Sequence, residues 1–149
     1  MTKRKVECGL YFGICGMILS PLFSHFFLAG LATTYTHAAF SLGGLLSGFL
    51  LGSLLSAFFG DSYKKSISGG IRIGFLAGPL TAFISMIGIE LYGKFQGGHN
   101  SFTQIFEIAA ILALFGGFFL SLPGTPIIIL FALLLTKILK IQDPIQKIV

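Results

Sequence analysis

Three ionisable residues lie within or at the ends of long apolar segments: His25, Glu90 and Glu107. Ionisable groups in a membrane segment are candidates for function, because a charge in hydrocarbon is costly. Counted at 1.5 Å per residue from the inner boundary, His25 lies about 24 Å and Glu90 about 28 Å across. Glu107 begins the fourth segment on the same side. The sequence therefore predicts an outer polar layer, either a proton-sensitive His–carboxylate group or a weak metal site.

The alternative interpretation of this layer is structural. A histidine near a segment end is satisfied by a neighbouring carbonyl, and the two carboxylates then lie at the interface. The three residues also lack a close helical spacing, such as two ligands at i and i+4, that would hold a metal ion. We therefore expect no resident metal ion and no cofactor.

Groups for catalysis are missing at the depth where they would act. No acidic residue lies in the middle of an apolar segment, so a cation-coupled exporter would lack its coupling residue. The sequence contains no Ser/His/Asp set, Gly-rich strand-to-helix loop or His/Cys cluster. Cys8 and Cys15 are i and i+7 on one helix face, so their Cα atoms would be about 10 Å apart, too far for a disulfide. The sequence predicts that the protein is not an enzyme.

The elements that must position these residues are apolar and long. Of 149 residues, 54% are apolar and only 10% are charged, whereas soluble domains carry about 25% charged residues. Segments at about 9–31, 38–59, 71–92 and 102–139 each provide the roughly 20 residues of one crossing. They do not alternate as barrel strands do, so we expect helices. The predicted fold class is all-α: one domain over 1–149, an integral membrane four-helix bundle.

The basic residues predict the orientation of this bundle. With the N-terminus in the cytosol, nine of the ten Lys and Arg residues lie inside and only Lys94 lies outside, a strong positive-inside signal. Both termini are then cytosolic. The predicted cytosolic basic surface contains Lys3, Arg4, Lys5, Lys64, Lys65, Arg72, Lys137 and Lys140. Topology and anionic lipid headgroups explain the net charge of +5 without a nucleic acid. Asp61 and Arg72 are expected to pair beside this surface.

Small residues recur at every fourth position, which allows the close backbone approach that holds helices together in lipid. The predicted packing positions are Gly44, Gly48, Gly52 and Ser56 in the second segment, Gly70, Gly74 and Gly78 in the third, and Ala109, Ala113 and Gly117 in the fourth. The second segment has another small face at Ala39, Gly43 and Ser47, which suggests a neighbour outside the bundle. We therefore expect a homo-oligomer; a tight monomer that uses every face internally is the alternative.

Prolines interrupt three of the segments. An interior proline removes one backbone hydrogen bond, and membrane helices tolerate it when a neighbour satisfies the freed carbonyl. The predicted kink positions are Pro21, Pro79, Pro123, Gly124 and Pro126. The stretch SLPGTP, residues 121–126, is expected to break the fourth helix. We favour a long kinked helix over a tail along the inner interface, because a further complete crossing would place Lys137 and Lys140 outside.

These features favour a non-catalytic, homo-oligomeric membrane subunit that anchors, or signals to, a cytosolic protein partner. Envelope-stress sensing and phage defence are two contexts for such a subunit. An oligomeric pore is the first alternative, because small residues could line a narrow channel. A small transporter or flippase that uses the broken fourth helix is the second. Composition suggests a bacterial inner membrane, with lipid and the partner as the expected contacts and no nucleic acid.

Overall fold

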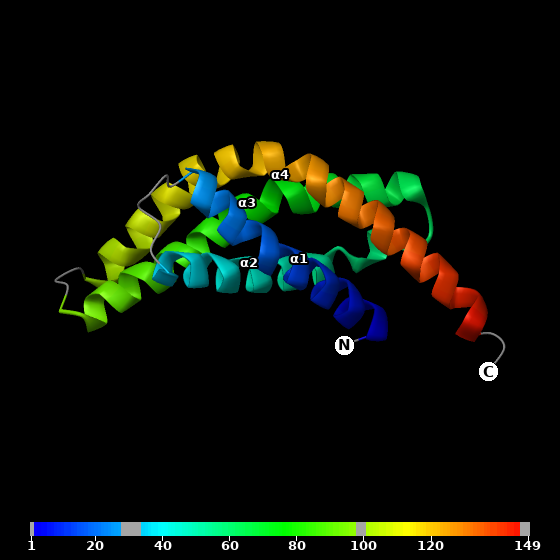
Figure 1. Ribbon diagram of the computed structural model, residues 1–149, viewed down its shortest axis with the longest axis horizontal. Coiled ribbons are helices and arrows are strands. Elements are labelled where there is room, and N and C mark those ends of the chain that lie inside the picture. The colour runs from blue at the N-terminus through cyan, green and yellow to red at the C-terminus, as the bar shows by residue number, and fades with distance from the viewer. Residues whose placement is uncertain (1, 28–33, 98–100, 147–149) are drawn as a thin grey trace.

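The computed structural model describes residues 2–27, 34–97 and 101–146, and their regular secondary structure is entirely helical. The elements are α1 (Lys3–Phe27), α2 (Thr34–Leu54), the short 3-10 helix η1 (Ser56–Phe58), α3 (Tyr63–Phe95) and α4 (Phe102–Gln146). The helices run back and forth along the long axis of the molecule (Figure 1). This order agrees with the predicted all-α class.

The helix boundaries differ from those expected from hydropathy. The first helix begins at Lys3 and the third at Tyr63, because a helix continues through the basic residues that precede an apolar run. The predicted residues 28–31 lie outside the described part. The second helix ends at Leu54, five residues before its predicted end. Phe59, the last residue of the predicted segment, lies after η1 and is fully buried. Gly60 then reverses the chain with a φ of +100°, a conformation that suits glycine.

The helices form two tightly packed hairpins. α1 packs along α2, α3 packs along α4, and contacts between α2 and α3 join the pairs, whereas α1 and α4 meet mainly through side chains such as Tyr11 and Phe131. Both termini and the α2–α3 connection lie toward one end of the molecule (Figure 1). A hydrophobic core cluster lies in the half near that end, where all four helices contribute. Its buried residues are Cys8, Phe12, Leu51, Phe59, Ile73, Ala132, Leu135 and Leu139.

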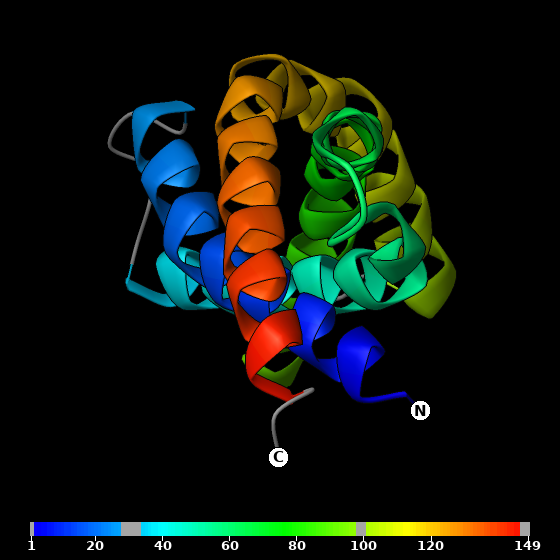
Figure 2. The ribbon, with the colours of Figure 1, turned by 90° about the vertical axis from the view of Figure 1, so that its right-hand side faces the viewer.

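α4 is a continuous helix, so the predicted break at residues 121–126 is wrong. The helix instead arches over the molecule, as Figures 1 and 2 show. Pro123 and Pro126 leave the carbonyls of Phe119 and Leu122 without their helical N–H donors. Beside them, Ser121 donates to the Gly117 carbonyl at 2.9 Å and Thr125 donates to the Ser121 carbonyl at 2.7 Å, each one turn back along α4. The two prolines thus lie in the arched part of α4 without ending it.

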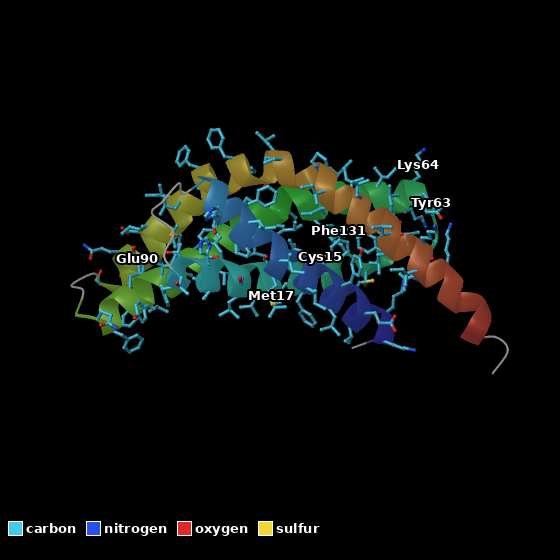
Figure 3. All side chains as sticks on the ribbon, viewed as in Figure 1. Cys15, Met17, Tyr63, Lys64, Glu90 and Phe131 are labelled. Carbon is cyan, nitrogen blue, oxygen red and sulfur yellow. The ribbon has the colours of Figure 1, made fainter. Side chains whose placement is uncertain are left out.

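Five helical stretches of the described residues are long and apolar enough to cross a membrane: Lys3–His25, Thr34–Leu54, Tyr63–Phe95, Phe102–Phe119 and Ser121–Lys140. The last two belong to α4, whose 45 residues correspond to about 67 Å along the helix. Large apolar side chains cover the outer faces (Figure 3); Leu10, Phe115 and Phe119 are all at least half exposed. Such a surface is compatible with lipid and not with water.

Candidate functional site

The first hairpin is held by direct backbone contact through glycine. A Cβ on Gly44 would overlap the Gly16 carbonyl, and one on Gly48 would overlap the carbonyl of Phe12. One turn further, a Cβ on Gly52 would come within 2.5 Å of the Cys8 carbonyl oxygen. The small-residue stripe of α2 therefore faces α1 along most of its length. Ser56, at the end of this stripe, is buried in η1.

The second hairpin uses the same device. The backbone of Gly78 in α3 meets Gly117 in α4, and a Cβ on Gly117 would overlap the Cα of Pro79. A Cβ on Gly74 would lie 2.7 Å from the Cα of Thr125, and one on Gly70 would lie 3.0 Å from the Cα of Ile129. The glycines of α3 therefore face the backbone of α4 over several turns. On α4, the predicted packing positions Ala109 and Ala113 are buried.

The other small face of α2 packs against α3. Ser47 hydrogen-bonds to Thr81 across this contact, with 2.6 Å between the hydroxyl oxygens. A Cβ on Gly43 would lie 3.0 Å from the Thr81 carbonyl oxygen and would overlap the Ser85 hydroxyl. The expectation of a homo-oligomer rested on this face. Both small faces of α2 are used within the chain, so their presence does not require a second copy.

A hydroxyl group on α4 compensates for the proline in α3. Pro79 has no N–H, so the Phe75 carbonyl one turn earlier lacks its helical donor. The Ser121 hydroxyl lies 3.1 Å from that carbonyl and 2.9 Å from the Gly117 carbonyl of its own helix, so its single proton is shared between the two. Proximity in sequence does not identify Ser121 for this role, because it lies 42 positions from Pro79 along the chain. Only the spacing of Ala109, Ala113, Gly117 and Ser121 places this serine on the packing face.

A cavity of about 70 Å³ lies between the two hairpins, and all four helices line it. Each helix contributes one hydroxyl: Ser20, Ser47, Thr81 and Ser121. The remaining lining is apolar or glycine and consists of Phe12, Cys15, Gly16, Leu19, Phe23, Phe40, Gly44, Gly48, Ile73, Gly74, Ala77, Gly78, Gly124 and Ile128. Gly124, one of the predicted kink residues, is buried here and faces the Phe23 ring.

Of the three residues predicted to form an outer polar layer, His25 lies beside a second histidine, His37, that the sequence pattern does not single out. The ring of His25 lies beside that of His37, with 5.6 Å between centroids. Ser24 is hydrogen-bonded to Nδ1 of His37 at 3.2 Å. The two histidines belong to consecutive antiparallel helices, so their proximity depends on the hairpin and not on a sequence motif. Glu107 is exposed on α4.

Glu90 lies on α3 at the end of the molecule opposite Lys64 (Figure 3). Nearby on α3, the Gly88 carbonyl accepts a 2.6 Å hydrogen bond from Tyr35, whose ring stacks on Tyr92 at 4.0 Å. Among the described residues, no three His, Cys, Asp or Glu side chains are grouped so that they could hold a metal ion.

Asp61 and Arg72 do not form the predicted ion pair; that prediction is wrong. Asp61 instead binds Arg4 at 3.2 Å and Lys65 at 3.8 Å. Arg72 lies further along α3 and stacks over the Phe58 ring at 4.6 Å. The packing of α1 on α2 brings Arg4 to the α2–α3 connection, which sequence distance alone does not indicate.

The other basic residues divide into two groups. Lys3 is 3.8 Å from Glu7, and Lys140 lies 4.3 Å above the Tyr63 ring. Lys5, Lys64 and Lys137 are exposed on α1, α3 and α4, and no ion pair or ring contact involves them within the described residues. Lys64 lies at the end of the molecule opposite Glu90 (Figure 3).

Comparisons with models of known protein families, with curated proteins and with solved structures find no match for this chain.

Proposed function

We propose that the chain is a non-catalytic membrane subunit that binds a cytosolic protein through its basic end, with both termini inside, in a bacterial inner membrane. The observation that carries the proposal is the set of three exposed lysines without ion-pair partners among the described residues, Lys5, Lys64 and Lys137. They come from three different helices. Positive groups that no internal carboxylate neutralises are available to an acidic partner.

The charge balance of this end supports an acidic partner. Eight described basic residues lie on it: Lys3, Arg4, Lys5, Lys64, Lys65, Arg72, Lys137 and Lys140. Only two carboxylates, Glu7 and Asp61, offset them among the side chains that the structure describes. Asp61 joins α1 to the start of α3 and so steadies the surface. The excess of positive charge at this end creates an electrostatic field that speeds association with a negatively charged partner.

An affinity experiment tests this proposal. Full-length tagged protein would be extracted gently from its own membrane and compared with the variant Lys5→Gln, Lys64→Gln, Lys137→Gln. The triple variant keeps the other basic residues that set topology. We expect an acidic protein to co-purify with the wild type and to be lost from the variant. A matched control is Lys94→Gln, which removes one charge at the opposite end and should leave recovery unchanged.

Other outcomes of this experiment count against the proposal. If the protein were recovered alone in several independent extractions, the proposal of a cytosolic partner would be wrong. Recovery only as a homo-oligomer, together with ion flux across planar bilayers, would favour the pore. Equal recovery of the partner with the wild type and the triple variant would show that the basic end is not the binding surface.

A further inference from the structure

The cavity between the hairpins lies near the middle of the helices that form it. Thr81 is 18 residues from the start of α3 and 14 from its end, or roughly 27 and 21 Å along the helix. Ser47 and Ser121 line the cavity from α2 and α4. If the helices span a bilayer, the cavity lies within the hydrocarbon region, away from both headgroup layers.

The cavity lies where the two hairpins face each other, away from the glycine contacts within each hairpin. Gly16 and Gly44 bring α1 and α2 together, and Gly74 and Gly78 do the same for α3 and α4, so the partner helix occupies the space in front of each of these glycines. Gly124 differs, because the nearest atom to a Cβ there would be 3.8 Å away. Protein interiors are otherwise closely packed, and voids larger than a water molecule are few. A space of about 70 Å³ is thus a departure from ordinary packing.

The walls of the cavity suit an uncharged, apolar group. No charged side chain lines it among the described residues. Ser121 donates to backbone carbonyls, and Ser47 bonds to Thr81 and to the Gly44 carbonyl. The hydroxyls of these three residues therefore already have partners within the chain. An ion or a phosphate group would find no counter-charge here, which makes its transfer from water costly.

The weakest seam around the cavity is the one between α1 and α4. The other neighbouring helices approach through glycine and backbone, but the backbones of α1 and α4 come close at few positions and these helices meet mainly through side chains. At the cavity, a Cβ placed on Gly124 of α4 would still be 3.8 Å from the Phe23 ring of α1. A methyl group therefore has room at this seam, in contact with the Phe23 ring, whereas a Cβ on Gly117 in the same helix would overlap α3.

We propose that the cavity binds the end of one lipid acyl chain, which enters between α1 and α4 past Phe23 and Gly124. The surrounding lipid supplies that group at the depth of the cavity. The size fits the end of a chain: an engineered apolar cavity of about 150 Å³ holds a benzene ring, and this one is about half as large. Binding there does not depend on a cytosolic partner.

Photo-crosslinking in a bilayer tests the proposal. Full-length protein would be reconstituted in phosphatidylcholine that contains a fraction of phospholipid with a diazirine at the terminal carbon of one chain. After irradiation, mass spectrometry would locate the adducts. We expect adducts on lining residues such as Phe23 and Ile128. The variant Gly124→Leu should lower them severalfold, Gly124→Ala should lower them less, and Phe23→Ala should raise those on Ile128.

Matched variants keep the result interpretable. Gly116→Ala, in open space on the same helix, and Phe119→Ala, on the outer face, should leave the cavity adducts unchanged. Should Gly124→Leu fail to fold, Gly124→Ala and Phe23→Ala still decide the question. Adducts confined to outward-facing residues such as Phe115 would overturn the proposal. So would equal cavity labelling in all variants, or exchanging water observed in the cavity by NMR.

Discussion

At the scale of single residues, Ser121 has the most specific structural role. It forms a hydrogen bond at 3.1 Å to the Phe75 carbonyl that Pro79 leaves without a donor. In lipid no water is available to replace this bond, so the Phe75 carbonyl of α3 depends on α4 for its donor. A proline that looks like a local feature of one helix therefore becomes a contact between two helices.

Removing the Ser121 hydroxyl should destabilise the protein only while Pro79 is present. We expect Ser121→Ala to cost about 1 kcal/mol, in the upper part of the range for hydrogen bonds between membrane helices. In Pro79→Ala, the restored N–H can donate to the Phe75 carbonyl, so the added Ser121→Ala should cost less. Unfolding in bicelles would give the four free energies of the cycle. Equal losses in both backgrounds would show that the serine and the proline act independently.

At the scale of the elements, the contacts of two neighbouring glycines explain how the helices pack. Gly117 lies against Pro79, and a Cβ there would overlap α3; Gly116 has no heavy atom of another element within 4 Å of that position among the described residues. The two residues differ in surroundings but not in type. Counting every fourth residue identified Gly117, and the structure shows which backbone it meets.

Alanine at these two positions should have opposite effects. We expect Gly117→Ala to destabilise the α3–α4 hairpin by about 1–3 kcal/mol, the cost typical of overpacking. Gly116→Ala should be neutral or stabilising by up to about 1 kcal/mol, because alanine is the better helix former. Thermal unfolding in detergent would compare the two variants. Similar losses at both positions would contradict the close contact at Gly117.

The arch of α4 is the other feature at this scale. Pro123 and Pro126 lie in the middle of a helix that remains continuous. Spin labels at exposed positions 106 and 137 would be about 46 Å apart in a straight helix. We expect pulsed EPR to give a shorter distance in the wild type and one nearer the straight value in Pro123→Ala, Pro126→Ala. A straight wild-type helix would be evidence against the arch.

At the scale of the whole molecule, the charges divide between two ends. Lys5 and Lys64 lie toward the end that holds both termini, and Lys94 lies near the last turn of α3 at the other. Lys94 also stacks over the Phe102 ring at 3.6 Å, which joins α3 to the start of α4. The positive-inside rule predicts that the end with Lys5 and Lys64 faces the cytosol and that the end with Lys94 faces outside.

Single cysteines should report that topology directly. In a background with Cys8→Ala and Cys15→Ala, cysteine at position 94 should react with a membrane-impermeant maleimide added outside intact cells. Cysteines at positions 5 and 64 should react only after the membrane is opened. Labelling of position 5 or 64 from outside would show that the orientation is the reverse of the predicted one. The basic end could then not bind a cytosolic partner.

The sequence by itself determined what depends on composition and on short periodic patterns. Low charge and long apolar runs indicated helices able to cross a membrane, and small residues at every fourth position marked faces for close packing. Only the tertiary structure decided which helix each face meets. In the folded chain the second small-residue face of α2 packs against α3, the ring of His37 lies beside that of His25, and Arg4 forms an ion pair with Asp61. It also kept α4 continuous through residues 121–126. These outcomes depend on contacts between residues far apart in the chain, which local periodicity does not encode.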